Sequence, residues 1–216
     1  MSSVNVVIPT IPRRSRMLGR AVASVAEQTH PADGITIVND HAGAGAWATR
    51  NRGIYAAAAT SPDWLAFLDD DDELLPHHLE HLLDVAGESG AGLVWAWFDV
   101  IGGTDPIPQF RGRPYDLEAP HTVPITFLVR TDVVLAAMRE TGGYQADASG
   151  TGAFDVQDFP MFHAMARIGG TANDDEVTWL WHHHGRNTSG LPATIEHRPI
   201  DNAGEDLADG IRNRPQ

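Results

Sequence analysis

The chain has 216 residues, of which 42% are hydrophobic and 20% are charged, and this composition is ordinary for one soluble globular domain. Its 29 acidic residues outnumber its 15 basic residues, and the formal charge of −14 disfavours nonspecific attachment to nucleic acid or anionic lipid. The sequence has no cysteine, which excludes disulfides and thiolate metal sites.

Strands and helices are predicted to alternate along the first ninety residues. Short β-branched or apolar runs predict strands at residues 4–9, 35–39 and 64–68. Helical spacing of apolar residues predicts a helix from Ser15, and an alanine-rich stretch predicts another that ends before Pro62. A third helix is predicted after Pro76. Three successive strand–helix units favour an α/β fold with a mostly parallel central sheet and helices on both faces.

The second half of the chain is less regular. The predicted strands are residues 93–103, 125–130 and 176–183, with a helix near residues 132–140. A proline-rich, irregular stretch covers residues 104–124, and we expect an irregular C-terminal arm at residues 185–216. Length and pattern together predict a single domain, residues 1–216.

Four consecutive aspartates, residues 69–72, follow the third predicted strand directly. At an effective dielectric of about 20, two carboxylates roughly 5 Å apart repel by on the order of 3 kcal/mol, so the run needs a cation or full exposure to water. In an extended chain, Asp69 and Asp71 would project to one side and Asp70 and Asp72 to the other. The run lies where open α/β sheets bind ligands, so it is a candidate Mg²⁺ or Mn²⁺ clamp for a diphosphate. The alternative is a solvated turn at the start of the next helix.

Three segments resemble, in order and spacing, the N-terminal half of the family-two glycosyltransferases with a GT-A fold. They are "VVIPTIPRRSRMLGRAVASVAEQTHP", "ITIVND" and "ATRNRGIYAAAATSPDWLAFLDDDDELLPHHLEHLL". The resemblance covers about residues 4–100. It implies transfer of a sugar from a nucleoside-diphosphate sugar to a hydroxyl acceptor, with inversion. It also implies that residues 4–100 bind the donor and residues 101–184 the acceptor.

The resemblance also assigns site residues. It implies that the donor contacts are Pro9, Thr10, Asp40, Arg50, Asn51, Asp69, Asp70 and Arg186. The Asp-x-Asp pair, Asp69 and Asp71, would hold a divalent ion, Mn²⁺ or Mg²⁺. His184, in "TWLWHHHGRNTSG", is the third implied metal ligand, since one imidazole beside two carboxylates is reasonable chemistry for such an ion.

The segment "FDVQDFPMFHAMARIGG" resembles the part of the family in which an aspartate at the start of a helix acts as general base. Asp158 takes that position and is our candidate, with Asp155 as the second candidate. Inverting transfer needs such a carboxylate to take the proton of the acceptor hydroxyl. Asp158 is also explained by a purely structural role, as a favourable negative charge at a helix N-terminus, and Pro160 in the first turn is consistent with both.

Two other functions remain open at this point. A nucleotidyltransferase has a similar sheet, but the loop "PTIPRR" lacks the glycines that cradle a triphosphate. A non-catalytic nucleotide-sugar-binding module would keep the fold without turnover. We find neither an export-type N-terminus nor an apolar run long enough to span a bilayer, so we expect a cytoplasmic protein. The sequence indicates no nucleic-acid contact and allows a homo-oligomer.

Overall fold

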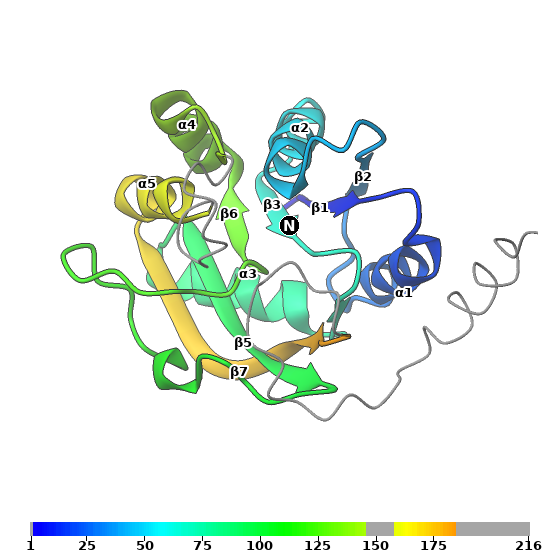
Figure 1. Cartoon of the computed structure of the whole chain (residues 1–216). Coiled ribbons are helices and arrows are strands. Elements are labelled where there is room, and N and C mark those ends of the chain that lie inside the picture. The colour runs from blue at the N-terminus through cyan, green and yellow to red at the C-terminus, as the bar shows by residue number, and fades with distance from the viewer. Residues whose placement is uncertain (1, 146–157, 185–216) are drawn as a thin grey trace, which may run out of the picture.

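The computed structural model describes residues 2–145 and 158–184, in which strands and helices alternate (Figure 1). The strands are β1 (Val4–Thr10), β2 (Gly34–Asn39), β3 (Trp64–Phe67), β4 (Glu73–Leu74), β5 (Leu93–Ile101), β6 (Leu128–Arg130) and β7 (Thr171–His182). The helices are α1 (Ser15–Ala26), α2 (Ala46–Ala58), α3 (His78–Ser89), α4 (Thr131–Thr141) and α5 (Phe159–Gly169), with a 3-10 turn η1 (Pro108–Phe110). None of these helices is both long and apolar enough to cross a membrane.

The strands form one sheet in the order β2-β1-β3-β6-β5-β7-β4. β1 pairs in parallel with both β2 and β3, whereas β6 is antiparallel to its neighbours β3 and β5. β7 is parallel to β5, and the two-residue strand β4 is antiparallel to β7. All strands except β6 and β4 therefore point the same way, and the predicted α/β fold with a mostly parallel sheet is confirmed.

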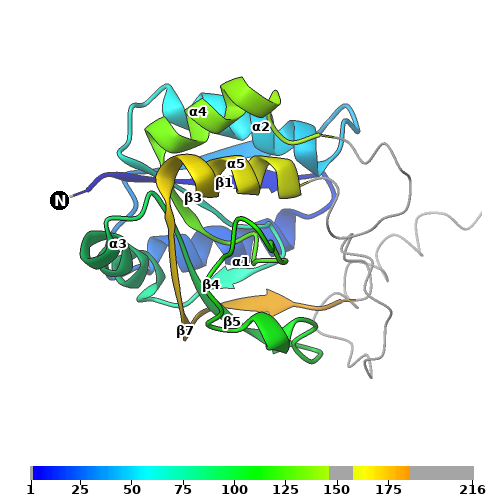
Figure 2. The ribbon, with the colours of Figure 1, turned by 90° about the vertical axis from the view of Figure 1, so that its left-hand side faces the viewer.

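Helices cover both faces of the sheet, as predicted. In Figures 1 and 2, α2, α4 and α5 lie on one face and α1 and α3 on the other. Each face has its own apolar core, because the sheet separates side chains that alternate along every strand. Along β1, for example, Val7 packs into the core under α2, whereas Val6 and Ile8 pack into the core over α1 and α3.

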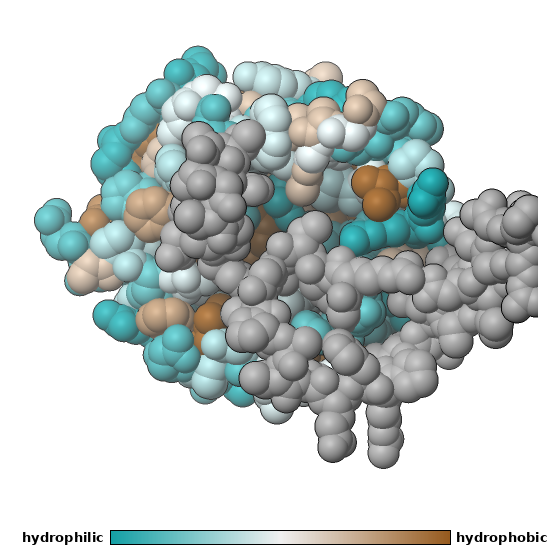
Figure 3. All heavy atoms as spheres, viewed as in Figure 1, coloured by the Kyte–Doolittle hydropathy of each residue, from teal (hydrophilic) through white to brown (hydrophobic). Residues whose placement is uncertain are grey.

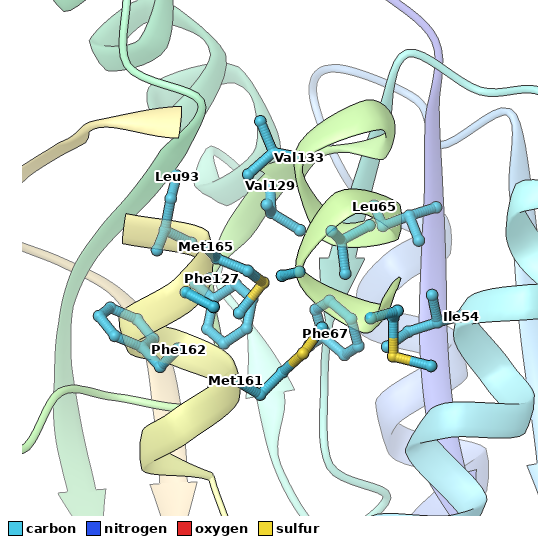
Figure 4. Close-up of a cluster of buried hydrophobic side chains, with 14 of the residues drawn as sticks. Ile54, Leu65, Phe67, Leu93, Phe127, Val129, Val133, Met161, Phe162 and Met165 are labelled. Carbon is cyan, nitrogen blue, oxygen red and sulfur yellow. The ribbon is translucent and has the colours of Figure 1, made fainter. Parts of the chain in front are cut away.

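The core under α2, α4 and α5 is rich in aromatic and methionine side chains. Figure 4 shows Phe67 and Phe127 close together, with Met161 and Met165 of α5 pointing toward them. The rings of Phe67 and Phe127 have centroids 4.9 Å apart. Burying side chains of this size contributes about 1.5–3 kcal/mol each, which fixes α5 against the end of β3.

One glycine allows α2 to lie very close to the sheet. A Cβ atom on Gly53 would be only 2.5 Å from Cγ1 of Val7 in β1, and real Cβ atoms do not approach so closely. The helix therefore packs with its backbone almost on the strand. Arg50 lies one turn earlier on the same helix, so this contact also sets where Arg50 is held.

Three details differ from the sequence-based expectation. β4 was not predicted, since two residues are too short to show a period. β7 begins at Thr171, five residues before the expected strand, because irregular pairing with β5 accommodates the polar residues 173–176. β6 is shorter than expected and begins at Leu128. The predicted C-terminal arm, residues 185–216, lies outside the described residues.

Candidate active site

A cavity of about 610 Å³ lies beyond the carboxyl ends of β1 and β3. This is the edge of an open α/β sheet at which ligands bind. Figure 3 views the molecule from this side, and its coloured residues are mostly hydrophilic, with apolar residues scattered among them. The predicted donor contacts Pro9, Thr10, Asp40 and Arg50 line the cavity, as do all four aspartates of the acidic run and Asp158.

The acidic run forms a tight turn and is not extended. The amide of Asp72 donates to the carbonyl of Asp69 at 3.2 Å, so the expected alternation of side chains is wrong. As a result Asp69, Asp71 and Asp72 present oxygens that all lie within 4.8 Å of one another. Asp70, Asp71 and Asp72 are 2–7% exposed, which also excludes a solvated turn. The turn instead buries the carboxylates of Asp70, Asp71 and Asp72. It also brings oxygens of Asp69, Asp71 and Asp72 close together.

Asp70 and Asp71 are held from the side of β1 and the loop after it. Asp70 accepts a hydrogen bond from Thr10 Oγ1 at 2.6 Å and another from Arg14 Nη1 at 2.8 Å. The same Arg14 nitrogen lies 3.1 Å from Asp71. The predicted site residues Thr10 and Asp70 therefore bind each other, and Arg14, which sequence reasoning missed, neutralises part of the cluster.

The end of β7 holds the acidic turn from the other side. The backbone amide of His182 donates to Asp72 Oδ1 at 2.9 Å. Nε2 of His184 lies 2.9 Å from Asp71 Oδ2, and because the carboxylate accepts, this nitrogen carries the hydrogen. The predicted metal ligand His184 thus contacts the cluster by a hydrogen bond to Asp71. The side chains whose ligand atoms converge are those of three aspartates. Asp72, missed as a ligand, could have been found from the uninterrupted acidic run.

The buried carboxylates differ in how readily they ionise. Burial raises the pKa of Asp72 well above its usual value, and the charges of Asp71 and Asp69 raise it further. Burial also raises the pKa of Asp70. For Asp71, burial acts in the same direction but is outweighed by the hydrogen bond with His184 and the charge of Arg14, so its pKa is lowered. The turn therefore has more buried negative charge than its protein partners neutralise.

Arg50 connects the acidic turn to Asp158. Its Nη2 donates to Asp69 Oδ1 at 2.7 Å, and its Nη1 lies 3.7 Å from Asp158 Oδ1. Arg50 is itself buried. The structure thus brings together a carboxylate of the candidate metal cluster and the candidate base, 89 residues further along the chain, on one guanidinium group.

Asp158 stands at the N-terminal end of α5 but does not cap it. Its side chain makes no capping hydrogen bond, although Pro160 lies in the first turn as expected. Oδ1 is buried and has no hydrogen-bond partner among the described residues, and the whole side chain is 37% exposed. Burial raises the pKa of Asp158, Arg50 lowers it and Asp69 raises it, and the net shift is upward. A capping hydrogen bond therefore does not explain this carboxylate, whereas its place at the N-terminus of α5 fits the favourable charge expected there.

Two predicted donor contacts are used by the fold itself. Asp40 accepts hydrogen bonds from the amides of Ala44 at 2.9 Å and Gly45 at 2.7 Å, and these bonds lower its pKa. It shapes the loop before α2 while still lining the cavity. Asn51 is not among the residues that line the cavity, because its side chain points to Tyr144, where it bonds both the backbone amide and the carbonyl.

Aromatic residues of β5 and β7 form another part of the wall. Phe98, Trp179 and Trp181 line the cavity, with the Phe98 ring centroid 4.9 Å from that of Trp179 and 5.9 Å from that of Trp181. Phe98 and Trp179 are buried, and Trp181 is partly exposed. Aromatic faces of this kind pack well against the apolar faces of ring-shaped ligands. Arg186 and Asp155, the other predicted site residues, lie outside the described part of the chain.

A comparison with protein families supports the resemblance seen in the sequence. Residues 42–132 match the model described as "Glycosyl transferase family 2". The match runs from the loop before α2 through the acidic turn to the start of α4. The predicted family-two resemblance is confirmed over this segment, and it supports glycosyltransferase activity. No curated protein matches the chain.

Solved structures of S. aureus TarS have the same fold. The complex of TarS 1-349 with UDP-GlcNAc matches with a TM-score of 0.69 and 14% identity, covering 97% of this chain and 71% of that one. The UDP complex matches with a TM-score of 0.65 and 14% identity, covering 97% and 70%. A further crystal structure of TarS 1-349 matches with a TM-score of 0.65 and 15% identity. That match covers 83% of this chain and 60% of TarS 1-349. These matches confirm the GT-A fold.

Proposed function

We propose that the protein is a metal-dependent glycosyltransferase that moves a sugar from a nucleoside-diphosphate sugar to a hydroxyl acceptor, with inversion. One observation carries the proposal. Three carboxylates converge within 4.8 Å in the wall of a cavity that also contains Arg50 and the separate carboxylate of Asp158. A cation-binding cluster and a distinct base at one cavity are the two parts that inverting transfer needs.

Asp69, Asp71 and Asp72 would hold the cation. Four carboxylates are crowded in the turn, while Arg14 and Arg50 supply two fixed positive charges. An excess of buried negative charge and an all-carboxylate donor set fit a hard divalent ion such as Mn²⁺ or Mg²⁺. When bound, such an ion offsets the charge that develops on a departing diphosphate. His184 would position Asp71 by its hydrogen bond.

The residues at the end of β1 and in α2 would bind the donor. Pro9, Thr10 and Asp40 line the cavity where the nucleotide is expected, and Arg50 offers positive charge beside the acidic turn. TarS was crystallised with UDP and with UDP-GlcNAc, which makes UDP the first nucleotide to test here. In this arrangement residues 4–100 bind the donor and residues 101–184 bind the acceptor, which would pack against Trp181 in the cavity wall.

Asp158 would take the proton from the acceptor hydroxyl as that oxygen attacks the anomeric carbon. Its pKa is raised by burial, and a carboxylate with a raised pKa accepts a proton more readily. Arg50, 3.7 Å away, favours the ionised form and so keeps the group available as a base.

A cytoplasmic location stays a prediction, which cell fractionation would test.

Release of nucleotide from a donor tests the proposal. We expect the wild-type protein to hydrolyse or transfer a UDP-, GDP-, CDP- or dTDP-sugar in the presence of Mn²⁺ and to stop when the ion is chelated. Asp158→Asn should lower kcat by about 10²- to 10⁴-fold and leave donor binding intact. Asp84→Asn, an exposed position on α3, is the matched control.

Two outcomes would contradict the proposal in different ways. Tight donor binding by the wild-type protein without metal-dependent release from any donor would identify a binding module. If Asp158→Asn turns over as fast as the wild type, the assignment as an enzyme stands, but Asp158 is not its base.

A further inference from the structure

Tyr144 carries a buried hydroxyl that has no hydrogen-bond partner in the part of the chain that the structure describes. The residue is 1% exposed and lines the cavity, and its Oη has no hydrogen-bond partner among the described residues. Buried polar groups in native proteins nearly always have a partner, and an unpaired one calls for an explanation. A ligand oxygen in the adjoining cavity would supply such a partner.

The backbone around Tyr144 is held firmly. Oδ1 of Asn51 accepts from the Tyr144 amide at 2.9 Å, and Nδ2 of Asn51 donates to the Tyr144 carbonyl at 2.8 Å. Gly142 and Gly143 precede it with φ of +78° and +89°, a conformation that other residues rarely adopt. A residue fixed in this way holds its buried hydroxyl at a defined point next to the cavity that it lines.

The surroundings of the phenol identify which part of a ligand it faces. Tyr144 lines the same cavity as the candidate base Asp158, Arg50 and Asp69 of the cation cluster. All three charged groups also act on the phenol electrostatically. Burial, the largest influence, raises its pKa, which keeps the hydroxyl protonated and able to donate. In a bound donor the sugar lies between the diphosphate at the cation and the hydroxyl group that the base activates.

We propose that Tyr144 Oη binds an oxygen substituent of the donor's sugar and so helps to select which sugar is transferred. This inference rests on the proposed function. A hydroxyl that is buried, fixed and unpaired discriminates well, because a sugar without an oxygen at that point leaves it unsatisfied. Asn51 and Gly143 are positioning residues for this contact.

Titration of Tyr144→Phe tests the assignment. The probes are UDP-, GDP-, CDP- and dTDP-linked sugars and the four free nucleoside diphosphates, each with Mn²⁺ and measured by calorimetry. For whichever sugar donor the wild type binds, we expect Tyr144→Phe to raise its Kd about tenfold and leave the Kd of the matching free nucleotide unchanged. In turnover, KM for the donor should rise more than kcat falls.

Tyr115→Phe is the matched control. The Tyr115 hydroxyl already has a partner, Nδ1 of His163 at 3.2 Å, and this residue is not among those lining the cavity. We expect it to bind donor and nucleotide as the wild type does. Thermal unfolding of both variants would verify that each remains folded.

The possible results separate this inference from the proposed function. If the wild type binds none of the nucleotide sugars, the proposed function fails and this assignment fails with it. If the wild type binds a donor and Tyr144→Phe binds it equally well, the proposed function stands and the Tyr144 contact is refuted. A loss of equal size for the donor and for the free nucleotide would also overturn the sugar contact.

Discussion

The amide of His182, at the end of β7, donates to the carboxylate of Asp72, which lies 110 residues earlier in the acidic turn. β7 thereby holds the acidic turn at Asp72, while Arg14 holds it at Asp70 and Asp71. The second half of the chain thus completes the geometry of a carboxylate cluster that the first half supplies. Asp72 is buried, close to two other carboxylates and tied by only one of these contacts, which makes it the most informative position to change.

Asp72→Asn should have opposite effects with and without metal. The amide keeps Oδ1 as acceptor for His182 but removes a buried charge that Asp69 and Asp71 repel. Without metal we expect the melting temperature to rise by about 2–4 °C, equivalent to about 1 kcal/mol in a chain of this size. With Mn²⁺, the stabilisation of the wild type should largely disappear in the variant, because a cation ligand is lost.

Thermal unfolding with Mn²⁺ and with chelator measures both effects. Asp84→Asn, exposed on α3, should follow the wild type in both conditions. Equal stabilisation of the wild type and Asp72→Asn by Mn²⁺ would count against Asp72 as a ligand.

Gly143→Ala should destabilise the fold through the contact that fixes Tyr144. A Cβ atom on Gly143 would lie 2.6 Å from Oδ1 of Asn51, and the backbone φ of +89° disfavours any side chain. We expect a loss of about 1–3 kcal/mol in the free energy of unfolding, measured with urea. Gly87→Ala in α3 is the matched control, since nothing lies within 4 Å of its Cβ position. It should gain about 0.5–1 kcal/mol, and equal effects at the two sites would contradict the packing argument.

His78 should make stability depend on pH below neutrality. It is fully buried, its Nδ1 lies 2.8 Å from Thr178 Oγ1, and burial lowers its pKa from 6.5 to about 3. Between these values the unfolded chain binds a proton that the folded protein does not. The contribution of His78 to stability therefore rises with pH in this window, by up to about 1.4 kcal/mol per pH unit, whereas the raised pKa values of Asp70, Asp72 and Asp158 act in the opposite direction.

Urea unfolding at several pH values between 4 and 7.5 checks this slope. His78→Gln should lower the slope of stability against pH relative to the wild type across the window, whatever its stability at neutral pH. His41→Gln changes an exposed histidine and should keep the wild-type slope. A slope that survives in His78→Gln would assign the pH dependence to other groups.

Local patterns in the sequence were sufficient to predict the α/β architecture. The strand before the acidic turn is short and apolar, and α1, α2 and α3 follow their strands at the expected places. Strand β4 and the early start of β7 were missed, because both depend on pairing between distant segments. The antiparallel orientation of β6 relative to β3 and β5 also has no signature in the local sequence.

The site was predictable by residue type more than by geometry. The acidic run and Asp158 could be singled out, and the structure brings them to one cavity. That the run folds into a turn depends on Thr10, Arg14 and His182, which contact it from outside. The part that Asn51 plays could not be predicted either, since its partner Tyr144 is 93 residues away and the contact is made with backbone atoms.

The close approach of α2 to β1 at Gly53 influences the charges in the cavity, because the same helix carries Arg50. Gly53 packs against Val7 of β1, and Arg50, three residues earlier on α2, donates a hydrogen bond to Asp69. Any larger residue at Gly53 would push the helix outward and draw the guanidinium away from both acidic groups it serves. The pKa of Asp158, which the Arg50 charge lowers, therefore depends in part on how closely α2 packs against β1 at Gly53, a residue that does not line the cavity.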